Sequence, residues 1–171
     1  VELPKDFIKD KVILHFGAVD QIAEVFVNGQ FVMKHVGGFL PFEMDIKPYL
    51  EENTATIIVR VQDTTNSSYH SSGKQALKPE GIWYKPQSGI YMPVWLESVK
   101  IGYIESIKIT PDIDEKVVKI SFKSSNKSAK LNLKNQIYEI EADKENIISI
   151  KDMRLWSPED PYLHEFVISN D

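Results

Sequence analysis

The stretch that decides the fold reads Val25-Phe-Val-Asn-Gly-Gln-Phe-Val-Met-Lys-His-Val-Gly-Gly-Phe-Leu-Pro-Phe-Glu-Met-Asp45. Apolar runs flank Asn28-Gly29, and this dipeptide is the strongest short hairpin signal because both central residues of a type I′ turn need positive φ. Gly37-Gly38 then ends the second strand, and Pro41 leads into a third. We expect the last residue of the stretch, Asp45, to tie a turn. The stretch predicts an antiparallel hairpin followed by a change of direction.

Short strands with alternating apolar residues are expected on both sides of this hairpin. In the first hundred residues they cover Val12–Phe16, Pro41–Ile46, Thr54–Asp63 and Ile90–Val99, with Val12–Phe16 apolar on both faces and therefore central. In the remainder they cover Ile107–Ile109, Val118–Phe122, Leu131–Leu133, Tyr138–Ile140, Ile148–Ile150 and Tyr162–Ser169. No helical periodicity is sustained, and Lys47–Glu52 predicts at most one helical turn. Regularly spaced strands without helices are typical of β-sandwiches, so we predict two all-β domains, residues 1–100 and 101–171.

Composition excludes several classes of protein. The 171 residues carry 20 Lys and Arg against 25 Asp and Glu, a net charge of −5, so the basic surface of a nucleic-acid-binding protein is missing. No apolar run reaches the ~18 residues of a membrane span, and without cysteine there is no disulfide. The opening Val1-Glu-Leu-Pro reads like the middle of a protein, so we expect a truncated N-terminus and assign no compartment.

Motifs for metals, cofactors and acid–base chemistry are weak. The four histidines, His15, His35, His70 and His164, have no second ligand at metal-binding spacing, and no glycine loop precedes a helix, so we expect neither metal nor cofactor. Glu43 and Asp45 lie two residues apart on one strand, which places their side chains ~6–7 Å apart on one face. Glycoside hydrolysis uses carboxyl pairs at such separations. We favour the simpler interpretation, a solvated strand face.

Residues 64–82 form a long segment without a strand pattern, and a loop of this length is either functional or a mobile surface loop. Aromatic residues gather in and after it, and their flat faces suit the C–H faces of sugars. We favour packing roles for Tyr91 and Trp95. Trp83 and Tyr84 lie in irregular backbone, where ligand binding and packing are equally expected. With Tyr69, they are our candidate substrate-binding residues.

Several motifs together resemble one family over nearly the whole chain. They are Val12-Ile-Leu-His-Phe-Gly-Ala-Val-Asp20, Val25-Phe-Val-Asn-Gly29, His35-Val-Gly-Gly-Phe-Leu-Pro-Phe-Glu-Met-Asp-Ile46, Ile58-Val-Arg-Val61, Ser88-Gly-Ile-Tyr-Met-Pro-Val-Trp-Leu-Glu97 and Leu155-Trp-Ser-Pro-Glu-Asp-Pro-Tyr-Leu163. In this order they resemble the N-terminal half of family 2 glycoside hydrolases, the relatives of β-galactosidase, β-glucuronidase and β-mannosidase. The resemblance implies a jelly-roll (galactose-binding-like) sugar-binding domain, N-terminally incomplete here, followed by an immunoglobulin-like sandwich.

The resemblance also implies what the parent protein does. It would be a retaining exo-glycosidase that hydrolyses the O-glycosyl bonds of β-linked sugars with two glutamates, carried by a (β/α)₈ barrel expected after about Asp171. This part would scaffold the barrel, be inactive alone, and possess a sugar-facing loop within Thr64–Ser88. Some members place an acidic residue where this chain has Trp83 and Tyr84, a departure that argues against galactose specificity. Members often form homo-oligomers through these domains.

Two other functions stay open from the sequence. One is a stand-alone carbohydrate-binding module that holds glycans through Trp83 and Tyr84. The other is a structural, adhesion-type pair of sandwiches with no role in glycan binding. The residues alone do not distinguish these functions from that of a glycosidase fragment, because an aromatic cluster by itself does not specify a sugar or a linkage.

Overall fold

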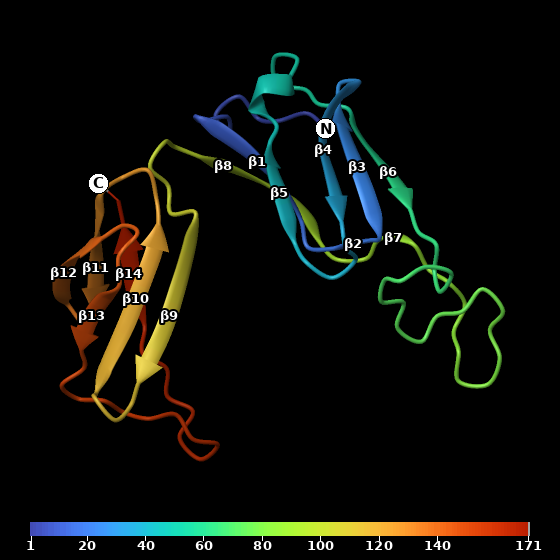
Figure 1. The fold of residues 1–171 in the computed structure, drawn as a ribbon. Helices are drawn as coiled ribbons and strands as arrows, with labels where there is room; N and C mark the ends of the chain where they lie inside the picture. Colours follow the sequence, from blue (N-terminus) through green and yellow to red (C-terminus); the bar gives the residue numbers. More distant parts are fainter. Residues whose placement is uncertain (171) are drawn as a thin grey trace. The chain divides into compact units, whose positions relative to one another are not determined.

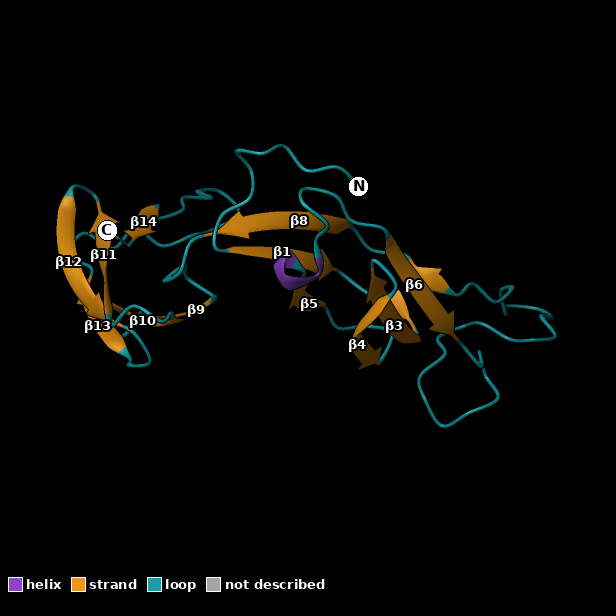
Figure 2. Cartoon of the chain, turned by 90° about the horizontal axis from the view of Figure 1, so that it is seen from above, coloured by secondary structure: helices purple, strands orange, loops and turns teal. Residues whose placement is uncertain are grey.

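The computed structural model describes residues 1–170 and consists of β-strands joined by turns and loops (Figures 1 and 2). The chain divides into two compact units, residues 1–100 and 101–171. The one helical element in the described part is a single 3₁₀ turn, η1 (Lys47–Tyr49), where the sequence predicts at most one turn. No described helix has the length and apolar character needed to cross a membrane. The predicted all-β fold is confirmed.

The first unit contains eight strands, all paired antiparallel. They are β1 (Lys11–Phe16), β2 (Val19–Asp20), β3 (Ile22–Val27), β4 (Gln30–Val36), β5 (Phe42–Asp45), β6 (Ile57–Gln62), β7 (Gly89–Ile90) and β8 (Val94–Val99). Two three-stranded sheets, ordered β5-β1-β8 and β4-β3-β6, make the sandwich, and β2 pairs with β7 at one end. The predicted central position of β1 is therefore confirmed.

The core of this unit lies between the two three-stranded sheets. Val12, Leu14 and Phe16 point into it from β1, and Val25 and Val27 point into it from β3, all of them 0–1% exposed. The two-residue spacing follows from the pleat of a strand, which turns alternate side chains to the same face. Burying each such side chain contributes about 1.5–3 kcal/mol, so this layer supplies much of the unit's stability.

The predicted hairpin is confirmed in conformation as well as in position. Asn28 and Gly29 have φ of 46° and 76°, as a type I′ turn between β3 and β4 requires. The Asn28 side chain does more than permit the turn. Its Nδ2 donates to the Tyr49 carbonyl at 2.9 Å, and its Oδ1 accepts the Thr56 N–H at 2.7 Å. The turn is thus joined to η1 and to the chain that follows it.

The carboxylates of β5 have structural partners. Asp45 Oδ1 accepts the backbone N–H of Val12 at 3.1 Å and of Lys47 at 3.0 Å, which confirms its predicted role in a turn. Glu43 contacts Nδ1 of His15 at 3.0 Å across the strand pair. The Glu43 and Asp45 side chains therefore have structural partners on a strand, which agrees with the strand-face interpretation instead of a catalytic pair.

The predicted strand Ile90–Val99 is wrong as a single element. β7 ends at Ile90 and β8 begins at Val94, because Pro93 has no N–H to give to a ladder. The Pro93 carbonyl instead accepts the Gly17 N–H at 2.9 Å.

Breaking this strand separates two aromatic residues that alternation placed on one strand face. The Tyr91 hydroxyl donates to the Gly38 carbonyl. Trp95 stacks on the His15 imidazole, with ring centroids 4.7 Å apart. Nε2 of this imidazole, the nitrogen that does not contact Glu43, contacts Glu97 at 3.2 Å. Trp95 thus has a stacking partner and Tyr91 a hydrogen-bond partner, but neither ring is buried, since Tyr91 is 56% and Trp95 47% exposed.

The second unit is a sandwich of six antiparallel strands. They are β9 (Ser106–Asp112), β10 (Val117–Lys123), β11 (Ser128–Leu133), β12 (Gln136–Glu141), β13 (Asn146–Ser149) and β14 (Phe166–Ser169). The sheets are ordered β13-β10-β9 and β12-β11-β14. They enclose a separate core that includes Ile120, Phe122, Leu131 and Ile140, each at most 2% exposed.

The closing strand of the second unit is shorter than predicted. The sequence predicts Tyr162–Ser169, whereas β14 begins at Phe166. The preceding residues bond to the adjoining loop instead of a strand: the Tyr162 N–H donates to the Asp160 carbonyl at 2.8 Å, and His164 Nε2 lies 2.9 Å from the Arg154 carbonyl oxygen.

Candidate functional site

The long segment between β6 and β7 leaves the end of the first unit's sheets, as the green part of Figure 1 shows. Asp63 fixes both of its ends. One carboxylate oxygen accepts the Thr65 N–H at 2.7 Å, and the other accepts the Ser88 hydroxyl at 2.6 Å. A single side chain thereby holds the start and the end of the segment together.

The interior of the segment has its own hydrogen bonds. The Tyr84 N–H donates to the Lys74 carbonyl at 2.8 Å, and the Ala76 N–H donates to the Tyr84 carbonyl at 3.1 Å. The Gln75 side chain accepts the Gln87 N–H at 2.5 Å. These bonds join two passes of the chain side by side, so the segment presents a defined surface.

Two hollows flank the pass at residues 72–75. One, of about 320 Å³, is lined by Asp20, Phe39, Ser71, Ser72, Gly73, Lys74, Gln75, Gln87, Ser88, Gly89, Ile90 and Tyr91. The other, of about 630 Å³, is lined by Asn66, Ser72, Gly73, Gln75, Ala76, Lys78, Glu80, Gly81 and Trp83. Amide, hydroxyl and charged groups line both, together with Phe39 and Tyr91 in the smaller hollow and Trp83 in the larger one.

The three candidate substrate-binding residues differ in their position and exposure. Trp83 lines the larger hollow and is about half exposed, so one part of its ring is available. Tyr84 is held by its backbone, but its side chain lines neither hollow. Tyr69 is fully exposed and touches His70 edge to face, with ring centroids 6.5 Å apart. The structure therefore brings Trp83, but neither tyrosine, to a hollow.

Asp20 lines a candidate hollow, and the sequence analysis did not single it out. It lies opposite Gly89 in the β2–β7 pair and lines the smaller hollow. Burial raises the pKa of its carboxyl, and the Asp63 carboxylate raises this pKa further. A hydrogen bond from Gln75 and the charge of His70 lower the pKa, but by less. β2 has only two residues, too few for any alternation to mark Asp20.

The groups that line these hollows suit the binding of a polar ligand. Each hollow combines hydroxyls, amides and a carboxylate with an aromatic ring, which suits a ligand with many hydroxyl groups and apolar C–H faces. In the described part of the chain, no group of three or more His, Cys, Asp or Glu residues could hold a metal ion.

We expect Asp20→Asn to raise the melting temperature of the first unit at pH 7. A raised pKa means that the folded state holds the proton more tightly than the unfolded state. The contribution of the protonated Asp20 carboxyl to folding stability is complete below the ordinary pKa of 3.8. It is lost as the pH rises through the raised pKa. The asparagine side chain does not ionise, so the variant avoids this loss of stability. The difference in melting temperature between Asp20→Asn and wild type should therefore shrink as the pH of the thermal melts is lowered from 7 towards 4. Asp6→Asn, in an exposed turn of the same unit, is the control for the change in net charge. A lower melting temperature for Asp20→Asn at pH 7 would contradict the prediction.

Comparisons with known proteins cover both units. The family model described as "Glycosyl hydrolases family 2, sugar binding domain" matches residues 1–99, and the one described as "Glycosyl hydrolases family 2" matches residues 102–171. A β-galactosidase of Thermoanaerobacter pseudethanolicus is 29% identical over 90% of this chain, and a β-glucuronidase of Paenibacillus borealis is 29% identical over 95% of it.

A solved structure gives the same relationship in three dimensions. The β-D-glucuronidase of Dictyoglomus thermophilum superposes with a TM-score of 0.75 and 27% identity over 98% of this chain. This chain spans 32% of that protein, 23% of the β-galactosidase and 30% of the Paenibacillus β-glucuronidase. The match is therefore to a part of each relative.

Proposed function

Because the chain belongs to glycosyl hydrolase family 2, we propose that it is the non-catalytic N-terminal part of a glycosidase of the β-galactosidase or β-glucuronidase type. The parent hydrolyses O-glycosyl bonds of β-linked sugars with a catalytic barrel, and the two sandwiches scaffold that barrel. The observation that carries the proposal is the consecutive match of two domains of one family to residues 1–99 and 102–171.

Three carboxylates of the first unit bear on the division of labour between this chain and a barrel. A retaining glycosidase needs a nucleophile and an acid–base residue on opposite sides of one glycosidic bond. Asp45 and Asp63 are each occupied by two hydrogen bonds, and Glu43 is paired with His15. These are structural roles, which supports a chain that is inactive alone and depends on a barrel for catalysis.

The segment at residues 64–88 is the part of the chain that would shape the sugar site. Its ends are fixed by Asp63, and it presents the Trp83 ring beside polar groups. A flat ring next to hydrogen-bonding groups orients a sugar, since the ring takes the C–H face and the polar groups take hydroxyls. In the parent, Trp83 would thus contribute to substrate specificity.

The second candidate function is a stand-alone carbohydrate-binding module. The observation that favours it is the same half-exposed Trp83 in a polar hollow, which is present without any barrel. The two functions differ in what the isolated chain does, because a module binds glycans by itself and a scaffold needs its catalytic partner.

We expect calorimetric titration of the chain with methyl β-galactoside, β-glucuronide and β-mannoside to show no saturable binding. Trp83→Ala and Trp95→Ala form a matched pair, since the two rings are 48% and 47% exposed and Trp95 lies on the His15 face instead. Binding that is lost in Trp83→Ala and kept in Trp95→Ala would establish the module and reject the scaffold. Sequencing the gene downstream of Asp171 gives an independent test, because a scaffold requires a barrel with two glutamates.

A further inference from the structure

Asn28 and Gly29, at the tip of the β3–β4 hairpin, form the dipeptide in which the thermolabile asparagine side chain deamidates most readily. The Gly29 backbone nitrogen attacks the side-chain carbonyl carbon of Asn28 and forms a C–N bond to it. The bond from this carbon to the side-chain nitrogen breaks, and ammonia leaves with the Gly29 proton. Water then opens the resulting five-membered succinimide, which gives aspartate or isoaspartate. Glycine obstructs the attack least, because it has no Cβ.

The Gly29 side of the turn is open to this chemistry. Gly29 is exposed, and apart from the adjoining residues no atom lies within 4 Å of the position that a Cβ would occupy there. Water can therefore reach the turn, and the surroundings of Gly29 do not shield it. Any protection against the reaction has to come from the way in which the Asn28 side chain is held.

Hydrogen bonds fix the Asn28 carboxamide at both its nitrogen and its oxygen. Nδ2 donates to the Tyr49 carbonyl at 2.9 Å and to the Thr54 carbonyl at 3.4 Å, and Oδ1 accepts the Thr56 N–H at 2.7 Å. Ring closure needs the carbonyl carbon to face the Gly29 nitrogen at about 3–3.5 Å or less. Rotation of the carboxamide into this position breaks the bonds to residues 49–56, so the folded turn opposes the reaction.

Neither product of the reaction can restore these bonds. An ionised aspartate only accepts hydrogen bonds, so it would face the Tyr49 and Thr54 carbonyl oxygens without a proton to donate. Isoaspartate adds a methylene to the backbone of a two-residue turn whose length sets the strand register. We propose that Asn28 is a deamidation site controlled by its own hydrogen bonds: the closed hairpin prevents the reaction, and a hairpin that has opened is modified irreversibly.

The first test compares the rate of modification in the folded and the unfolded chain. The chain is incubated at mildly alkaline pH with and without concentrated urea, beside a synthetic peptide of residues 25–32, and peptide mapping by mass spectrometry follows the conversion of amide to acid. We expect the unfolded chain to react at the rate of the peptide. The folded chain should react about tenfold to a hundredfold more slowly, because two or three hydrogen bonds have to open first.

Asn146 is the matched control, because its side chain is held in the same way but isoleucine follows it. Its Nδ2 donates to the Ile120 carbonyl at 3.1 Å and the Glu141 carbonyl at 2.9 Å, and its Oδ1 accepts the Glu141 N–H at 2.8 Å. In urea, Asn146 should stay unmodified while Asn28 is converted, and Gly29→Ala should slow the conversion. Equal rates in the folded and the unfolded chain, faster reaction at Asn146, or an unchanged rate for Gly29→Ala in urea would overturn the proposal.

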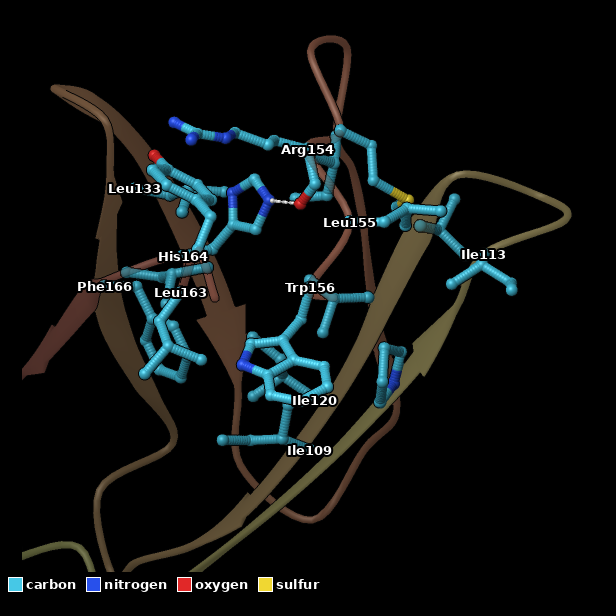
Figure 3. A pocket seen from close by; sticks show the side chains of 17 residues that line it. Ile109, Ile113, Ile120, Leu133, Arg154, Leu155, Trp156, Leu163, His164 and Phe166 are labelled. Carbon is cyan, nitrogen blue, oxygen red and sulfur yellow. Dashed lines mark hydrogen bonds between the residues drawn. The ribbon is translucent and has the colours of Figure 1, made fainter. Parts of the chain in front are cut away.

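The second test uses Asn28→Asp, which reproduces one product. We expect a lower melting temperature for the first unit and shifts in ¹⁵N–¹H spectra at the amides of residues 49–56. The indole of Trp156, in the apolar cleft of the second unit (Figure 3), should keep its signal. Asn66→Asp, at an exposed asparagine of the same unit, adds the same charge and should melt like wild type. A wild-type melting temperature for Asn28→Asp would show that the product still closes the turn and would overturn the proposal.

Discussion

Phe16→Ala should destabilise the first unit by about 3–5 kcal/mol, the range for truncating a buried phenylalanine. Phe16 is 1% exposed and stacks on Phe42 with ring centroids 4.9 Å apart, in the layer between the two sheets. Truncation removes the apolar contacts and leaves a cavity that fixed strands cannot close. For a unit of this size, the loss corresponds to a fall in melting temperature of more than about 10 °C.

Scanning calorimetry measures this effect and tests the separation of the two cores. The second unit has its own buried cluster around Phe122 and Leu131, so its transition should keep its temperature in Phe16→Ala. Phe39→Ala is the matched control, because Phe39 is 63% exposed and its loss should change stability by less than about 0.5 kcal/mol. A shift of both transitions together would show that the units unfold as one.

Asn28→Ala should cost about 2–4 kcal/mol through two separate losses. Asn28 holds φ at 46°, which costs an alanine about 1–2 kcal/mol. The substitution also removes the bonds to the Tyr49 carbonyl and the Thr56 N–H, which are part-buried and exposed and so contribute about 1–2 kcal/mol together. Urea unfolding monitored by fluorescence would measure the sum.

Asn28→Gly separates the two losses. Glycine adopts positive φ without strain, so this variant should lose only the side-chain hydrogen bonds, and we expect about half the cost of Asn28→Ala. Equal costs for the two variants would show that the backbone conformation of the turn contributes nothing. Costs near zero for both would show that the bonds to Tyr49 and Thr56 are dispensable.

Local chemistry explains what could be predicted from the sequence. The Asn28-Gly29 turn, the buried face of β3 and the turn tied by Asp45 all follow from residue type and two-residue alternation, and all are found. These signals lie within a few residues of the element that they specify. The order of motifs along the chain then identified the family, which no single motif could do.

Contacts between distant segments explain what could not be predicted. Pro93 itself signals the break between β7 and β8, since it has no N–H, but the partner of its carbonyl, the Gly17 N–H 76 positions earlier, is set by the fold. Asp20 became a site residue only when the fold placed it near Gln75 and Asp63. The predicted strand Tyr162–Ser169 begins only at Phe166, because Tyr162 and His164 bond to the preceding loop instead.

Asp63 also bears on how family members can diverge in this region. Because one carboxylate holds both ends of the segment at residues 64–88, the chain between them can lengthen or shorten while the strands stay in place. Closing a flexible loop of twice the length costs only about 0.6 kcal/mol more. Insertions and deletions here are thus nearly neutral for the sandwich, and natural selection can vary the proposed sugar-facing segment without changing the strands that support it.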